Sequence, residues 1–519
     1  MKFCKLLVLL LSASVLSCFA QDITSFEKRI QVRTLPNGLT VILMQRKEAP
    51  VFSFYTMVDA GSAQDPKGET GLAHMFEHMA FKGTDVIGTT DYAAEKVVLA
   101  KIEEVYAEYI RERDRRIGHD DQKVAALEKQ WKGLISEADK YVIHNQFGEL
   151  VEQNGGAGMN ASTNEDETVY YYSMPVNRLE MWAYLESSRF AHPVMREFYK
   201  ERDVVYEERR MRTESNPIGR LLEQFNATAF MASPYRNPTI GWPFDLHTFS
   251  ATDAYNFFEK YYVPSNMTIA VVGDLDFATT WPIIDKYFDP LPTRAKPDEA
   301  VTTEPPQDSK RSVVLTEQTQ PVYLEGYHRP SYLDKDDLVF DAITDVMSNG
   351  RTSRLYRSLV RDKRIAIQSA GFSGMPGNKY AHLFAFYAFP TPGHTPAEVR
   401  DAIHEQIDLL RKQDITDDEL KMVKTRARAN LIRSLGNNPG LATDLATYQA
   451  RYGDWRELFR EIDRIDQITK EDIRRVANQY FVENNRTESQ IQTAQMPPRR
   501  PQAGAAEGNP TPQQEQQPQ

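Results

Sequence analysis

The chain of 519 residues is poor in cysteine: it has two, Cys4 and Cys18, and both lie near the N-terminus. Cleavage after Ala20 would leave no cysteine, which excludes a disulfide framework and thiolate catalysis in the remaining protein. Beyond the N-terminal segment, the sequence also lacks an apolar run long enough to cross a membrane as a helix. Acidic residues outnumber basic ones, and the net charge of −11 argues against nucleic acid as a partner.

The N-terminus has the pattern of a secretory signal peptide. Lys2 and Lys5 precede a short apolar run, Leu6 to Leu11, and a small-residue cleavage site lies directly before Gln21. We therefore expect residues 1–20 to be removed and the protein to be exported, to the periplasm if the source is a bacterium. As an alternative, residues 15–18 resemble a lipoprotein box in which Cys18 would be lipidated. Leu16, the second residue of this segment, fits the box poorly, which favours export without an anchor.

The length predicts two or more domains, because single cores rarely grow beyond about 250–300 residues. Proline-rich residues 289–311 have the composition of a linker, which separates a first domain at 21–288 from a second at 312–493. Residues 494–519 are rich in proline and glutamine, as disordered tails are. Within the first domain, residues 91–150 carry two helical stripes of apolar residues on a charged background, which predicts an inserted helical hairpin.

The two predicted domains share a sequence repeat. Residues 249–253 match residues 468–472, and residues 261–266 match residues 480–485 at the same offset of 219. Each copy has the pattern of a helix with a polar N-cap and an aromatic end, followed by a strand. The repeat therefore predicts that the fold is duplicated.

The most distinctive motif is His-x-x-Glu-His at His74, Glu77 and His78, in a small and apolar sequence context. On a helix the two imidazoles lie one turn apart and the carboxylate shares their face. Two neutral imidazoles can bind zinc and leave the carboxylate beside the ion as a base. A histidine pair on a helix more often belongs to a surface or a core, but a buried carboxylate without a partner is costly, which favours the metal site. Thr70 is a suitable N-cap for this helix.

A weaker match relates the helix that ends at Gly83 to the helix that ends at Gly350. In this match Asp341, Thr344 and Asp345 stand where the first domain has the three motif residues. Aspartate and threonine do not reproduce a pair of imidazoles, so we expect the second domain to have no metal site.

Two other segments are ambiguous by themselves. Glu201 and Glu208 lie seven residues apart on one face of a charged helix, where carboxylates are usually exposed to solvent. Glycine-rich residues 155–158 precede Asn160 and Ala161, and they suit either an ordinary loop or the close approach of another backbone.

Together the motifs resemble those of the pitrilysin/insulinase family of zinc metallopeptidases, in particular its shorter members similar to mitochondrial processing peptidase. The resemblance extends over roughly residues 30–490. It implies an α+β fold of two homologous domains, each an antiparallel sheet covered by helices, with the helical hairpin inserted in the first. It rests on five motifs in the family's order, namely Leu35-Pro36-Asn37-Gly38-Leu39, His74-x-x-Glu77-His78, Asn160-Ala161-x-Thr163, Glu201-Arg202-Asp203-Val204-Val205-x-x-Glu208 and Gly350-x-x-Ser353-Arg354-Leu355-Tyr356.

The resemblance also implies a role for each candidate residue of the metal site. One Zn²⁺ per chain would be held by His74, His78 and Glu208, while Glu201 would not bind the metal but would orient one of its ligands or the water. Glu77 would be the general base. The stretch from His78 to Glu208 is longer than the family normally has, and the inserted hairpin accounts for the difference.

For the substrate, the resemblance implies an edge strand with Asn160 and Ala161 that pairs with a peptide backbone. The family often has an arginine in its second domain, followed about two turns later by a tyrosine. Arg361 fits the arginine, but the tyrosine position falls at Ile367 or Gln368. A partner chain would then supply the missing pair, so we expect a homodimer or a heterodimer with another chain of the family.

The predicted function is that of an exported zinc-dependent endopeptidase, which hydrolyses peptides or unfolded segments with a zinc-activated water and a glutamate base. The alternative is a non-catalytic or partner-dependent subunit of a heteromeric peptidase or peptide-binding complex. A structural zinc site is disfavoured, because it would need four protein ligands and no base. The predicted ligands also tolerate manganese or cobalt.

Overall fold

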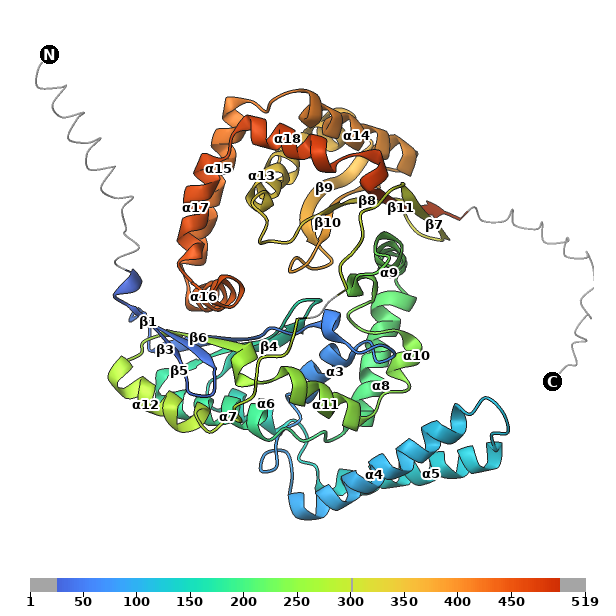
Figure 1. Cartoon of the computed structure of the whole chain (residues 1–519), viewed down its shortest axis with the longest axis vertical. Helices are drawn as coiled ribbons and strands as arrows, with labels where there is room; N and C mark the ends of the chain where they lie inside the picture. Colours follow the sequence, from blue (N-terminus) through green and yellow to red (C-terminus); the bar gives the residue numbers. More distant parts are fainter. Residues whose placement is uncertain (1–25, 300–301, 495–519) are drawn as a thin grey trace, which may run out of the picture.

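The computed structural model describes residues 26–299 and 302–494, which form two sheets, each covered by helices (Figure 1). We call the parts of the chain around the first and second sheets the first half and the second half. The predicted signal peptide, the lipoprotein box and most of the C-terminal tail lie outside the described residues. Within the described residues, no helix is both long and apolar enough to cross a membrane.

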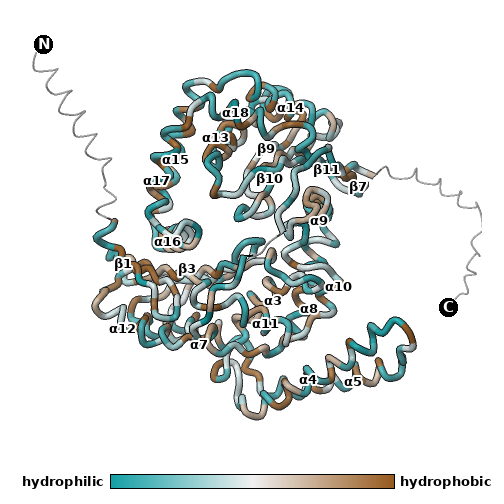
Figure 2. The backbone as a smooth tube through the Cα atoms, in the orientation of Figure 1, coloured by the Kyte–Doolittle hydropathy of each residue, from teal (hydrophilic) through white to brown (hydrophobic). Residues whose placement is uncertain are grey.

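The first sheet has six strands, and its hydrophobic strands stand out in Figure 2. Its helices form the main core with one face of the sheet. All neighbours are antiparallel except one parallel pair, β2 with β6. In spatial order the strands are β1 (Ile30–Thr34), β2 (Thr40–Gln45), β6 (Met267–Gly273), β3 (Val51–Val58), β5 (Thr168–Pro175) and β4 (Ala157–Thr163). The covering helices include α3 (Leu72–Met79), α7 (Leu179–Ala191), α8 (Phe198–Arg209), α11 (Ala251–Tyr261) and α12 (Phe277–Phe288).

The second sheet repeats the order of the first without its outer strand β1. It too has one parallel pair, β7 with β11, at the place of β2 and β6. In spatial order its strands are β7 (Arg311–Glu317), β11 (Arg486–Thr493), β8 (Val322–Arg329), β10 (His382–Pro390) and β9 (Ala366–Met375). Its core is completed by α13 (Asp337–Ser348), α14 (Pro396–Lys412), α15 (Asp417–Ser434), α17 (Glu457–Gln467) and α18 (Lys470–Tyr480). The predicted α+β class with two similar domains is confirmed.

The repeat in the sequence corresponds to a helix and a following strand that occur at the same place in both halves. Helix α11 and strand β6 in the first half are displaced by 219 residues from α18 and β11 in the second. Both helices begin with a capping box, Ser250 with Asp253 and Thr469 with Asp472, in which each side chain satisfies a backbone N–H of the other residue.

Each half also has a helix that packs against the sheet of the other half. Helix α9 (Pro217–Ala229) of the first half packs Leu221 and Phe225 against the second sheet. Helix α16 (Asn438–Tyr452) of the second half packs Leu441 and Leu445 on the face of the first sheet that its own helices leave open. Figure 1 shows both helices between the sheets. Because each sheet is covered by the other half, we expect the two halves to stabilise each other.

The predicted hairpin consists of α4 (Tyr92–Arg113) and α5 (Asp121–Ala138), and it projects from the first half at the bottom of Figure 1. Its helices meet through an aromatic contact between Tyr106 and Trp131, at 5.1 Å between ring centroids. The short helices α6 (Gln146–Gln153) and α10 (Pro243–Leu246) complete the first half.

Candidate metal centre

Helix α3 carries the His-x-x-Glu-His motif, and its first turn is held from outside the helix. The carboxylate of Asp65 accepts the backbone N–H of Gly71 at 2.7 Å and that of Ala73 at 2.9 Å. Gly71 is the N-cap residue and has a φ of 97°, a conformation that glycine adopts at little cost. The prediction that Thr70 caps the helix is therefore wrong, because its hydroxyl donates to Asp245 at 2.6 Å instead.

The structure brings His74, His78 and Glu208 together. The Oε2 atom of Glu208 lies 3.9 Å from Nε2 of His74 and 3.6 Å from Nε2 of His78. Two ligands of a tetrahedral zinc ion, at bond lengths of roughly 2.0–2.1 Å, are about 3.3 Å apart, so the three atoms are close to a ligand geometry. Burial also lowers the pKa of His74 to about 3, which keeps its imidazole neutral, as a metal ligand requires. These residues fit a zinc ion.

The second nitrogen of His78 is held by a chain of charged groups. Its Nδ1 atom lies 2.9 Å from Oε1 of Glu201, and Nζ of Lys82 lies 2.6 Å from Oε2 of the same carboxylate. Burial alone would raise the pKa of Glu201, but the hydrogen bonds from His78 and Lys82 lower it to about 2. The carboxylate therefore stays ionised and can orient the imidazole ring. The Nδ1 atom of His74, in contrast, is buried without a hydrogen-bond partner among the described residues.

The sequence alone suggested that Glu201 and Glu208 are exposed, and this was wrong. Their side chains are 14% and 16% exposed, because α8 packs against α3 and both residues face it. Only the resemblance pointed to these two residues. Because α8 is rich in charged residues, its buried face could not be recognised from the sequence.

Glu77 lies beside the three potential ligands, in a cavity of about 880 Å³. Burial raises the pKa of its carboxyl group, while a hydrogen bond from Thr163 opposes that shift. A carboxylate with a raised pKa is a better proton acceptor near neutral pH than an exposed one. The site thus combines two imidazoles and a carboxylate for a metal with a second carboxylate placed to accept a proton.

Two family models match the chain. The model described as "Insulinase (Peptidase family M16)" matches residues 40–99 and 132–242, and the model described as "Peptidase M16 inactive domain" matches residues 248–427. The chain belongs to peptidase family M16. The interval between the two matched parts of the first model falls within the hairpin of α4 and α5.

M16 relatives match most of the chain. The zinc protease PqqE of Helicobacter pylori is 27% identical over 88% of this chain and 90% of its own length. The probable mitochondrial-processing peptidase subunit beta of Arabidopsis thaliana is 24% identical over 88% and 77%. Among solved structures, a protease from Helicobacter pylori has a TM-score of 0.74 at 26% identity, covering 89% of this chain and 99% of its own. The periplasmic protease PqqL from Escherichia coli has a TM-score of 0.66 at 17% identity, and the match covers 90% of this chain but 48% of PqqL.

The sequence left open whether the glycine-rich segment before Asn160 is an ordinary loop. In the structure, residues 157–163 form strand β4 at the edge of the first sheet. Within the described ranges the strand pairs with β5 alone, so its other edge offers backbone groups that no strand of these ranges pairs with. Asn160 and Ala161 line the same cavity as Glu77. Arg361 is not brought there: its guanidinium pairs with the neighbouring Asp362 at 2.6 Å, and it is not among the residues that line the cavity.

A second group of potential ligands consists of Asp139, His144 and Glu197, of which His144 and Glu197 line the same cavity. Lys200 makes an ion pair with Asp139 and lies 3.9 Å from Glu197. Because an ammonium group already neutralises these carboxylates, this group fits a metal ion less well than the first.

The described part of the second half contains no group of three potential metal ligands. Helix α13 takes the place of α3 in the chain order of strands and helices and carries Asp341 and Asp345. Asp345, which the sequence match places at the position of His78, forms a salt bridge with Arg426 at 3.1 Å.

Proposed function

We propose that this chain is an exported M16 zinc endopeptidase that hydrolyses peptides or unfolded segments, with one Zn²⁺ held by His74, His78 and Glu208. The observation that carries the proposal is the convergence of these three ligand atoms beside Glu77, in a cavity that residues of the edge strand β4 also line. Three protein ligands leave a fourth position open, as a catalytic zinc site requires.

A zinc ion in this site would act as a Lewis acid and lower the pKa of a water molecule. Glu77 would accept the proton of the attacking water and deliver it to the nitrogen of the leaving amine. An extended peptide would add to the first sheet alongside β4, with Asn160 and Ala161 at the scissile bond. This pairing selects extended segments, because only an extended backbone can form the hydrogen bonds of a strand pair along β4.

Export and assembly complete the proposal. The charged and apolar pattern of residues 1–20 supports removal of a signal peptide, with lipidation at Cys18 as the alternative. The mitochondrial processing peptidase among the relatives is a named subunit of a larger enzyme. Since Arg361 pairs away from the cavity, we propose that a second family chain completes the substrate site. The domain limits 21–288 and 312–493, with the linker 289–311, are part of this proposal.

The test is cleavage of a mixture of unstructured peptides by the purified protein, analysed by mass spectrometry. We expect internal cleavage that a chelator abolishes and added zinc restores. Full zinc binding without cleavage, also in the presence of a family chain from the same source, would contradict the proposed peptidase and favour the non-catalytic subunit.

Arg212 gives a first prediction, because it holds the oxygen of Glu208 that faces away from the histidines. Its Nη1 atom lies 2.7 Å from Oε1 of Glu208, which leaves Oε2 directed at the two imidazoles. We expect Arg212→Ala to weaken zinc affinity by about 10-fold at most, the low end for loss of a group that orients a ligand, because its side chain is 72% exposed. Competition with a chromophoric chelator measures the affinity.

Arg210 offers a matched control on the same turn. It pairs with Glu207 at 3.0 Å and does not line the cavity. Arg210→Ala is therefore expected to leave zinc affinity unchanged. Equal affinities of the two variants would contradict an orienting role for Arg212.

A further inference from the structure

The turn between β4 and β5 contains three consecutive carboxylates, and each contacts a different part of the chain. Glu165 accepts the hydroxyl of Thr239 at 2.8 Å within the first half. Asp166 contacts the loop between β9 and β10, and Glu167 contacts Arg451 of α16 at 3.3 Å, both in the second half. Asp166 and Glu167 are 5% and 8% exposed. Burying adjacent carboxylates is costly unless they are well paired. Asp166 accepts two backbone N–H groups and Glu167 accepts a guanidinium, whereas Glu165 accepts a neutral hydroxyl, and burial raises its pKa to about 7.

Asp166 makes the most direct contact between the turn and the second half. Its Oδ2 atom accepts the backbone N–H of Asn378 at 2.7 Å and that of Lys379 at 3.0 Å. Its Oδ1 atom accepts the hydroxyl of Tyr235, which comes from the segment that precedes α10. Because the two amides belong to the main chain, the position of the loop itself is tied to this carboxylate.

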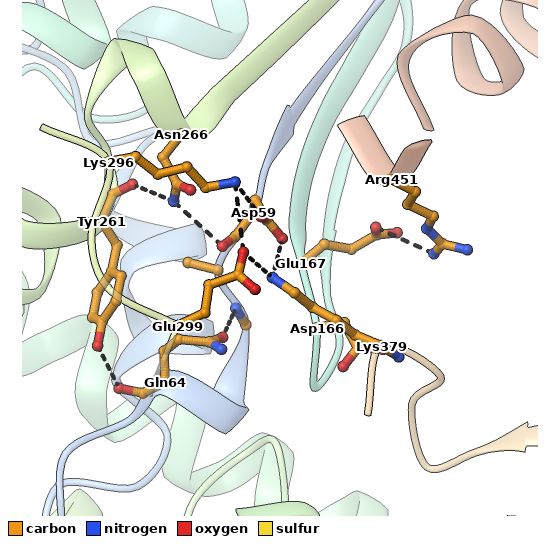
Figure 3. Close-up of polar contacts among 12 residues, drawn as sticks. Asp59, Gln64, Asp166, Glu167, Tyr261, Asn266, Lys296, Glu299, Lys379 and Arg451 are labelled. Carbon is orange, nitrogen blue, oxygen red and sulfur yellow. Dashed lines mark hydrogen bonds and ion pairs between the residues drawn. The ribbon is translucent and has the colours of Figure 1, made fainter. Parts of the chain in front are cut away.

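Ion pairs surround this contact, as Figure 3 shows. Lys379 pairs with Asp59 at 2.5 Å and with Glu299 at 3.3 Å, and Lys296 pairs with Asp59 at 3.0 Å. Asp59 directly follows β3, in the middle of the first sheet. The loop of the second half is thus held between the turn and the end of a central strand.

The turn leads directly to the residues that surround the proposed reaction. Thr163, the last residue of β4, pairs with Thr168 in the sheet and lines the same cavity as Glu77. Asn160 and Ala161 on the same strand line the cavity. Among the described residues β5 is the one neighbour of β4 in the sheet, and the turn joins the two strands, so a shift of the turn would shift the end of β4.

We infer that the second half, although its described part has no metal group, positions the substrate-binding strand β4 through Asp166. The inference rests on the proposed function and names Asp166 as a positioning residue. The loop between β9 and β10 holds the turn through Asp166, the turn joins β4 to β5, and β4 contributes Asn160 and Ala161 to the cavity that contains Glu77.

The test compares Asp166→Ala with wild type in two measurements. In zinc-loaded protein that also carries Glu77→Gln, so that bound peptide is not consumed, we expect faster hydrogen exchange of the β4 amides and weaker peptide binding. In protein with Glu77 intact, we expect kcat/KM to fall about 10- to 100-fold, mainly through KM, because misplacing a substrate by about 1 Å costs up to 10²-fold. Zinc affinity is expected to stay unchanged, since the contacts of Asp166 do not include the ligands. Asp166→Asn keeps an acceptor oxygen and is expected to restore part of the binding.

Arg46 provides the matched control, because it also joins the two halves but does not contact the turn. It donates to Asn438 at 3.2 Å and to the carbonyl of Gly436 at 2.8 Å. Arg46→Ala is expected to leave β4 exchange and peptide affinity unchanged. Equal effects of Arg46→Ala and Asp166→Ala would overturn the inference, as would unchanged β4 exchange in Asp166→Ala. If wild type binds no peptide at all, the proposed function fails, while the exchange of β4 still decides whether Asp166 positions the strand.

Discussion

Replacement of Glu77 by glutamine is expected to lower kcat by about 10²- to 10⁴-fold, the usual contribution of a general base. Glutamine has the size of glutamate but cannot accept the proton of the attacking water. The three potential ligands, His74, His78 and Glu208, are untouched by the change, so we expect the variant to bind one zinc ion. Steady-state cleavage of a fluorogenic peptide and the metal content of the same sample measure the two quantities.

The control for this variant is Glu207→Gln. Glu207 lies next to Glu208 in the sequence, but its side chain is 52% exposed and pairs with Arg210. Its loss is expected to leave kcat and zinc content unchanged. A Glu77→Gln variant that keeps full activity would exclude Glu77 as the base, and loss of zinc from it would show that the carboxylate helps to hold the metal.

Replacement of Phe225 by alanine is expected to lower the free energy of unfolding by about 3–5 kcal/mol, the range found for large aromatic residues in cores. Phe225 lies on α9 of the first half and is fully buried in a cluster with Leu324 and Leu383 of the second sheet. The cavity left behind therefore lies between the halves. Thermal and denaturant-induced unfolding, followed by circular dichroism, measures the change.

Leu222 on the same helix serves as the control, because 37% of it is exposed. Leu222→Ala is expected to change stability much less than Phe225→Ala. If Phe225→Ala lowered the midpoint of only one of two separate transitions, the halves would unfold independently, and the account of mutual stabilisation through α9 and α16 would be wrong.

Local patterns predicted much of the architecture. The apolar stripes on a charged background correspond to α4 and α5 in the structure. The repeat at an offset of 219 corresponds to two capped helices, each followed by a strand. The motif on α3 was correctly read as a buried helix that directs two imidazoles to one point. These features depend on contacts between residues a few positions apart, which periodicity and capping patterns report. The domain limits and the roles of the site residues stay predictions.

Features that depend on distant contacts could not be read from the sequence. The hydroxyl of Thr70 donates to Asp245, which lies 175 residues further along the chain, and Asp65 holds the start of α3 instead. The exchange of α9 and α16 between the sheets has no periodic signature, since both are ordinary amphipathic helices. Glu208 looked like a surface carboxylate because the neighbours that bury it lie far away in the sequence.

The measurement that tests the central claim most directly is an anomalous difference map at the zinc absorption edge, from crystals of zinc-loaded protein. The account predicts one strong peak within about 2.0–2.2 Å of Nε2 of His74, Nε2 of His78 and a carboxylate oxygen of Glu208. A peak at Asp139, His144 and Glu197 instead, or no peak at the α3 histidines, would contradict it.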